Sequence, residues 1–127
     1  MKVLVVEDEF YARKAMIRQI KKYDQDGLFE ISEASNGEEG WEFCEKYKPE
    51  LVLTDIRMPK MDGYEATREI RKVSKTVPII AVTAYSFASD KEKIMQNGFN
   101  GYMSKPVDIQ RLKEKLDYTI HGNFMMM

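Results

Sequence analysis

Short runs of apolar residues constrain the fold of this chain more than any other feature. The clearest are Lys2–Val6, Leu51–Leu53 and Pro78–Val82, in which apolar side chains follow one another without polar alternation. Such runs are typical of strands buried on both faces, as in a parallel sheet covered by helices on both sides. Two weaker strands are expected, one around Phe29–Ile31, with a more polar side suited to a sheet edge, and a short one at Gly101–Met103.

Segments with helical spacing of apolar residues separate these runs. The expected helices are Glu9–Tyr23, Glu38–Tyr47, Tyr64–Lys72, Ala88–Gln96 and one that follows Asp108. Strands that alternate with helices of this length predict parallel pairing through right-handed crossovers. We therefore expect an α/β fold with a doubly wound five-stranded parallel sheet of order 2-1-3-4-5, a flavodoxin-like (βα)5 arrangement. Residues 1–121 would form the domain and residues 122–127 a flexible C-terminal tail.

Composition excludes several classes of protein. The 127 residues suit one domain, and a formal charge of -1 recommends neither nucleic-acid nor membrane-surface binding. No stretch approaches the roughly 20 apolar residues of a membrane span, and the amino terminus is typical of a strand instead of a signal peptide. A single cysteine, Cys44, fits a reducing compartment. These features predict a cytoplasmic location.

Acidic residues follow two of the apolar runs. Glu7 and Asp8 come after the first run, and Asp55 comes after Leu51–Leu53. In the expected strand order these two strands are neighbours, so the three carboxylates converge at the carboxyl edge of the sheet. Two such charges about 4 Å apart repel by about 4 kcal/mol at an effective dielectric constant of 20.

A divalent cation is the expected partner of these carboxylates. Oxygen ligands with room for water favour Mg²⁺, with Mn²⁺ as an alternative metal. The acidic residues alone also allow two simpler arrangements. One carboxyl group can keep its proton, or Glu7 and Asp8 can simply cap the next helix.

Two further residues are expected at the same edge. Thr83 ends the fourth strand and Lys105 follows the fifth. Separately, a threonine there is an ordinary strand former and a lysine in a loop is usually solvated. Together with a metal site they predict phosphoryl transfer, in which the metal and Lys105 neutralise the phosphoryl oxygens while Asp55 attacks in line. The product would be an aspartyl phosphate on Asp55.

These motifs resemble the receiver domain of two-component response regulators over about Lys2–Ile120. The matching segments are VVEDE, LVLTDIRMPKMDG, PIIAVTAY and GYMSKP, in this order and spacing. The resemblance implies a phosphorelay signalling domain that is not an enzyme beyond its own phosphorylation and dephosphorylation. It implies Asp55 as phosphoacceptor, with Mg²⁺ as cofactor.

The resemblance also assigns roles around Asp55. Metal ligands would be Glu7, Asp8, Asp55 and the backbone carbonyl of Arg57; phosphate contacts would come from Thr83, the Ala84 backbone and Lys105; Tyr102 would be the switch aromatic, and Pro106 would follow a cis peptide. We also expect Arg57 and Tyr85, each two residues beyond a site residue, to tune the phosphoryl lifetime.

The expected partners follow from the same resemblance. A histidine kinase or a histidine phosphotransfer protein would donate the phosphoryl group. An unidentified downstream protein would bind a surface formed by the fourth helix, the fifth strand and the fifth helix. We expect a monomer or a phosphorylation-dependent dimer, with no contact to nucleic acid or membrane. A stand-alone receiver and a segment of a longer regulator or hybrid kinase both fit the sequence.

Three alternative functions fit the sequence less well. A flavin-binding protein of the same topology needs a loop rich in hydrogen-bond donors after the first strand, where the acidic residues Glu7–Glu9 would repel a phosphate. An aspartyl-phosphate phosphatase has a second acid two residues after the nucleophile, where this chain has Arg57. A degenerate receiver that binds partners without phosphorylation is disfavoured because every expected site residue is present. We therefore expect a phosphorylatable receiver.

Overall fold

The computed structural model describes residues 1–84, 88–105 and 114, and it contains one sheet of five parallel strands in the order β2-β1-β3-β4-β5. The expected fold class and strand order are therefore confirmed. The expectations for Tyr85, Pro106, the helix after Asp108 and the tail 122–127 lie outside the described residues. The strands are β1 (Lys2–Val6), β2 (Glu30–Ala34), β3 (Leu51–Thr54), β4 (Ile79–Thr83) and β5 (Gly101–Ser104), and the helices are α1 (Phe10–Tyr23), α2 (Gly37–Tyr47), α3 (Gly63–Val73) and α4 (Ala88–Gln96).

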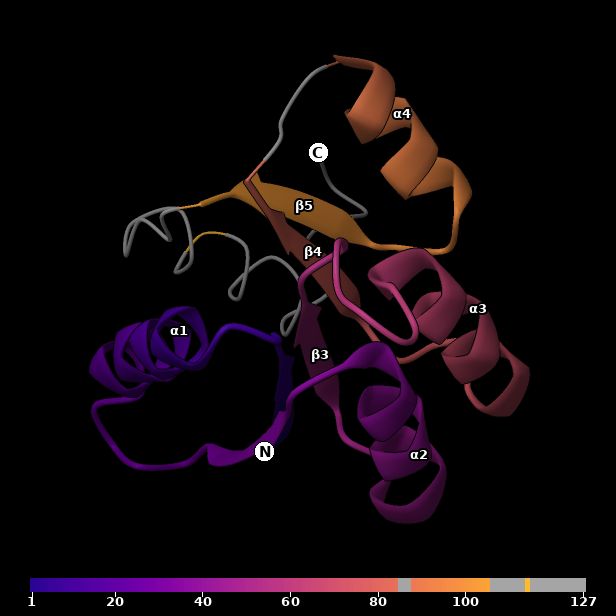
Figure 1. Cartoon of the computed structure of the whole chain (residues 1–127). Coiled ribbons are helices and arrows are strands. Elements are labelled where there is room, and N and C mark those ends of the chain that lie inside the picture. Colours follow the sequence, from indigo (N-terminus) through magenta and orange to yellow (C-terminus); the bar gives the residue numbers. More distant parts are fainter. Residues whose placement is uncertain (85–87, 106–113, 115–127) are drawn as a thin grey trace.

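The central strands are buried on both faces, as their unbroken apolar runs predict. Alternate residues of one strand enter different cores: Leu4 packs in one cluster and Val5 in the other. The first cluster includes Cys44 of α2 and Ile70 of α3, whereas the second includes Ile20 of α1. Figure 1 shows α1 on one side of the sheet and α2 with α3 on the other. Helices thus cover both faces of the sheet.

The edge strand β2 differs most from its expected position. The sequence predicts a strand around Phe29–Ile31, whereas β2 is Glu30–Ala34. The reason is pairing: β2 lies in register with β1 from Lys2 opposite Glu30 to Val6 opposite Ala34. Its length is thus set by a neighbouring strand, which its own half-polar pattern does not reveal.

Side-chain caps begin three of the helices. Glu9 accepts hydrogen bonds from two backbone N–H groups at the start of α1, and Asn36 accepts one from Glu39 N at the start of α2. Asp62 forms a capping box with Glu65 at the start of α3. Asn36-Gly37 therefore begins α2, one residue before the helix start that the sequence predicts at Glu38. These three helices therefore begin at the edge of the sheet where β1, β2 and β3 end.

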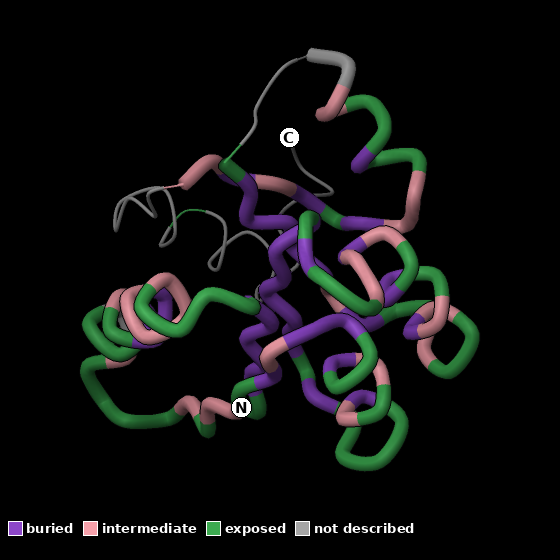
Figure 2. The backbone as a smooth tube through the Cα atoms, viewed as in Figure 1, coloured by how far each residue is buried: buried purple, intermediate pink, exposed green. Residues whose placement is uncertain are grey.

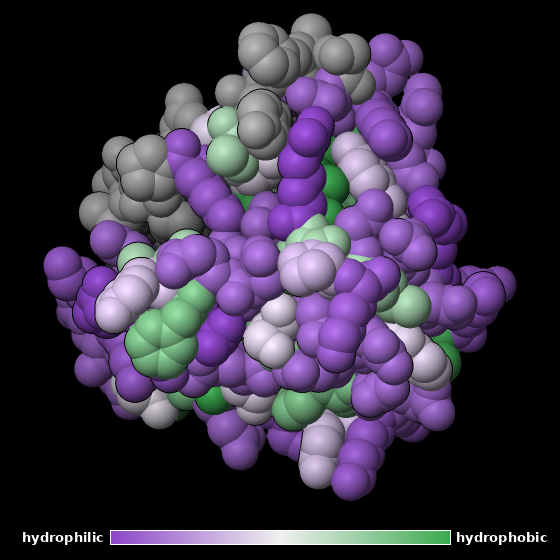
Figure 3. All heavy atoms as spheres, in the orientation of Figure 1, coloured by the Kyte–Doolittle hydropathy of each residue, from purple (hydrophilic) through white to green (hydrophobic). Residues whose placement is uncertain are grey.

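The residues of β1, β3 and β4 are nearly all buried. Figure 2 shows the buried backbone concentrated along the strands at the centre of the fold. The face in view in Figure 3 is largely hydrophilic, with small separate apolar areas. Within residues 1–84, 88–105 and 114, no helix has both the length and the apolar character needed to cross a membrane.

Arg71, near the end of α3, ties that helix to the segment that follows α4. Its guanidinium donates to Gly98 O at 2.7 and 2.9 Å, to Val77 O at 2.7 Å and to Asn100 Oδ1 at 2.8 Å. The Asn100 side chain also accepts from Ile79 N at 2.9 Å. All of these acceptors are uncharged, and burial lowers the pKa of Arg71. Arg71 thus fixes the start of β4 and the approach to β5.

We predict that Arg71→Met lowers the free energy of unfolding by roughly 2–4 kcal/mol, because several acceptors would lose their donor in a partly buried place. Urea denaturation followed by circular dichroism measures this loss. Arg68→Met is the matched control, since Arg68 is exposed on the same helix and makes one long hydrogen bond, 3.4 Å to Asn97 Oδ1. That control should cost less than about 0.5 kcal/mol. Equal losses in the two variants would contradict the role given to Arg71.

Candidate functional site

The ends of β1 and β3 lie side by side and carry the acidic residues. The two strands pair directly, with Val6 opposite Thr54. Asp55 follows Thr54 and donates its backbone N–H to Val6 O at 2.9 Å. Glu7 follows Val6 and donates its N–H to Ala34 O of β2 at 3.1 Å. Backbone pairing therefore continues one residue beyond each strand and sets both acids at the carboxyl edge.

Glu7, Asp8 and Asp55 form one cluster of carboxylates. Each offers an oxygen atom, and these atoms all lie within 4.8 Å of one another. Glu7 and Asp55 are buried, with exposed fractions of 0% and 7%, while Asp8 is exposed. Partial desolvation raises the pKa of Asp8, and the hydrogen bond to Glu7 and the negative charge of Glu7 act in the same direction. Three carboxylate oxygens this close together are hard donors that fit a divalent cation such as Mg²⁺.

Lys105, directly after β5, reaches into this cluster. Its ammonium group donates to Glu7 Oε1 and, at 3.1 Å, to Asp55 Oδ2. Burial acts to lower the pKa of Lys105, but the hydrogen bonds and charges of Glu7 and Asp55 outweigh it, so the pKa is raised. The lysine is held in place by its backbone, because Lys105 N donates to Thr83 O at 2.7 Å. Lys105 thus supplies a fixed positive charge beside the acidic residues.

The backbone around Asp55 is tightly packed against the start of α3. Ile56 N donates to Asp55 Oδ1 at 2.8 Å, and Gly63 N donates to Ile56 O at 2.7 Å. A Cβ atom at Gly63 would lie 2.4 Å from Asp55 O, which only glycine avoids. The Thr54 hydroxyl donates to the same Asp55 carbonyl at 2.8 Å. These contacts orient the Asp55 carboxylate and leave Oδ2 toward Lys105.

The other residues predicted at this site occupy the neighbouring strands and loops. Thr83 is buried at the end of β4, and Ala84, just beyond it, is exposed. Tyr102 on β5 is half-buried, lies opposite Ala81, and has the Lys91 ammonium 5.6 Å from its ring centre. The roles proposed for these three residues remain predictions. The same holds for Arg57, which is exposed in the loop after Asp55.

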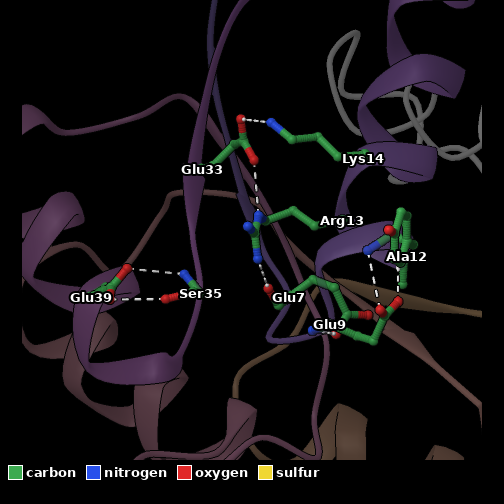
Figure 4. Close-up of polar contacts among 9 residues, drawn as sticks. Glu7, Glu9, Ala12, Arg13, Lys14, Glu33, Ser35 and Glu39 are labelled. Atoms are coloured by element: carbon green, nitrogen blue, oxygen red, sulfur yellow. Dashed lines mark hydrogen bonds and ion pairs between the residues drawn. The ribbon is translucent and has the colours of Figure 1, made fainter.

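Arg13 contacts this site and was not expected from the sequence. Its Nη1 atom donates to Glu7 O at 2.8 Å, and its Nε atom donates to Glu33 Oε1 at 2.8 Å, as Figure 4 shows. Glu9, the third acid after β1, does not complete the cluster but caps α1. The sequence shows only that an arginine lies one turn into the helix after the acidic residues. Nothing in that spacing identifies a carbonyl group as its partner.

Comparison with known proteins gives one family. The response regulator receiver domain matches residues 3–117. Among curated relatives, the sensor histidine kinase RcsC of Salmonella typhi is 32% identical over 91% of this chain. The probable C4-dicarboxylate response regulator DctR of Bacillus subtilis is 36% identical, also over 91% of this chain. The chain spans 12% of the length of the first relative and 50% of the second.

A solved structure supports the same assignment. The receiver domain of sensor histidine kinase PA1611 from Pseudomonas aeruginosa PAO1 superimposes with a TM-score of 0.84 and is 30% identical. The match covers 94% of this chain and 97% of that one. That crystal structure is described as having a magnesium ion coordinated in the active site cleft.

Proposed function

The chain belongs to the response regulator receiver domain family, and from this membership we propose that Asp55 accepts a phosphoryl group from a histidine kinase or a histidine phosphotransfer protein. One observation carries the proposal. The Asp55 carboxylate is buried at the end of β3, bonded to the Lys105 ammonium and within 4.8 Å of the oxygens of Glu7 and Asp8. The alternative of a binding module without phosphorylation would give these paired charges no chemical use.

The chemistry assigned to the site is a single displacement at phosphorus. A carboxylate oxygen of Asp55 forms a bond to phosphorus as the P–N bond of the phosphohistidine breaks, and the leaving imidazole nitrogen takes up a proton. Bound Mg²⁺, held by Glu7, Asp8, Asp55 and the Arg57 carbonyl, would supply positive charge to the phosphoryl oxygens. Lys105 donates a hydrogen bond to the new phosphoryl group in place of its bond to Asp55. Cys44 is a free, buried thiol, which fits a cytoplasmic location. A phosphohistidine donor fits the same location.

We predict that acetyl phosphate and Mg²⁺ add one phosphoryl group to the native chain and none to Asp55→Asn. Asparagine keeps the shape of the side chain but lacks the anionic oxygen that attacks phosphorus. Intact-mass measurement under denaturing conditions at low pH reads the result. Asp62→Asn is the matched control, because it alters an acid in the same loop while asparagine still caps α3. Labelling of Asp55→Asn, or labelling that survives chelation of the metal, would remove Asp55 as the metal-assisted acceptor.

We further propose that Arg57 and Tyr85 flank the path of the water that hydrolyses the phosphoryl group. Large side chains at these positions would obstruct that water, so Arg57→Ala should shorten the phosphoryl lifetime, and Arg57→Ala/Tyr85→Ala should shorten it further. The decay of the phosphorylated mass after donor removal measures both. Lys60→Ala, which removes a positive charge from the same exposed loop, should decay like the native chain. Identical decay in all four proteins would end the proposal.

The output proposed for this domain is a change of surface near α4 and β5. A phosphoryl group brings about -1.5 to -2 charges, and the Thr83 hydroxyl can donate to it by moving toward Asp55. That movement would open space for Tyr102 to change rotamer on the adjacent strand. The helix α4 has few apolar anchors: Ile94 is buried, but Met95 is 48% exposed. A weakly anchored helix suits a two-state element. A downstream protein would bind this surface, extended by the helix expected after Asp108.

We predict that a beryllofluoride mimic of the phosphoryl group shifts backbone amide resonances of α4 and β5 in the native chain. In Thr83→Ala the shifts should stay near Asp55, because the hydroxyl that moves is absent. Thr83→Ser is the matched control and should retain the distant shifts. Heteronuclear NMR spectra with and without the mimic decide the matter. Distant shifts that persist unchanged in Thr83→Ala would show that the coupling does not use this hydroxyl.

A further inference from the structure

Arg13 links Glu7, in the loop after β1, to Glu33 of the edge strand β2. The side chain comes from the first turn of α1 and is only 13% exposed. One nitrogen donates to the Glu7 carbonyl at 2.8 Å and another to the Glu33 carboxylate of β2 at 2.8 Å. Figure 4 shows the guanidinium between these two acceptors. The two bonds leave Arg13 little freedom to move relative to either strand end.

The Glu7 carbonyl belongs to the peptide group that joins Glu7 to Asp8. Because a peptide group is planar, the position of that oxygen sets the direction in which the chain continues to Asp8. The rest of Glu7 is also held: its N–H donates to Ala34 O at 3.1 Å, and its carboxylate accepts from Glu9 N at 3.1 Å. The Arg13 contact therefore helps to fix the backbone from which the exposed Asp8 carboxylate extends.

We propose that Arg13 is a positioning residue for the metal site: it holds the Glu7–Asp8 peptide in the orientation that presents both carboxylates to Mg²⁺. This inference rests on the proposed function. Glu33 orients the guanidinium, and hydrogen bonds from Lys14 and Arg13 lower the pKa of Glu33, so it stays ionised. A group that orients a metal ligand from outside the ligand set commonly changes metal affinity when it is removed.

The positive charge of Arg13 and its positioning role predict opposite changes in Mg²⁺ affinity when the residue is removed. Arg13 is positive and repels Mg²⁺, so its removal should strengthen metal binding if the residue acts only through its field. Loss of positioning should weaken binding. The sign of the change in Mg²⁺ affinity therefore separates the two roles.

The test is a Mg²⁺ titration of the native chain and of Arg13→Gln, followed by the amide resonances of Asp8 and Ile56. We expect the dissociation constant of Arg13→Gln to rise roughly tenfold. Arg13→Lys keeps the charge, but a single ammonium group cannot reproduce the two hydrogen bonds that Nε and Nη1 make in fixed directions, so it should weaken binding as well. Thermal unfolding without Mg²⁺ checks that each variant is folded.

Lys14→Gln is the matched control. Lys14 also donates to Glu33, at 2.8 Å, and carries the same charge, but its described hydrogen bond and ion pair are with Glu33 and not with Glu7. Its Mg²⁺ affinity should equal or slightly exceed the native value. Native affinity in Arg13→Gln, or an equal loss in Lys14→Gln, would overturn the inference while leaving the proposed function intact. A native chain that binds no Mg²⁺ would instead overturn the proposed function, and the inference with it.

Discussion

The ammonium group of Lys105, placed between the carboxylates of Glu7 and Asp55, is the interaction on which the carboxyl edge of the sheet depends. Two buried carboxylates beside each other repel and have lost their hydration, and a positive group between them offsets both costs. Lys105 lies 98 residues from Glu7 and follows β5. It therefore arrives only if β5 pairs with β4 and β4 with β3, so the charge balance of the site requires the assembled sheet.

Much of the architecture was predictable because the central strands carry their own information. A run such as Leu51–Leu53 is suited to burial between two layers of helices. The end of the run marks the end of the strand, and this places Asp55 at the edge of the sheet. The strand order then brought Glu7 and Asp8 to the same edge without any knowledge of distances. The edge strand β2 was predicted less well, since its limits come from pairing with β1 and its own residues are half-polar.

Arg13 and Arg71 were not predictable for a different reason. Most of their partners are backbone carbonyls, such as Glu7 O and Gly98 O, which every residue possesses. No residue type or spacing therefore predicts the contact. Only the folded chain shows which carbonyl lies within reach of the arginine. Glu9, the next acid in the sequence, has a local role, because its carboxylate accepts from Tyr11 N and Ala12 N and caps α1.

The hydrogen bonds that Arg71 donates to residues 98 and 100 have a mechanical consequence for α4. The described hydrogen bonds between α3 and this part of the chain reach residues 97–100, immediately beyond the last turn of α4. A nine-residue helix is about 13 Å long. If Gly98 stays fixed, a tilt of α4 by about 10° would move its first turn by about 2 Å. A small displacement at the end of β4 would then be larger at the start of α4 than at Gly98.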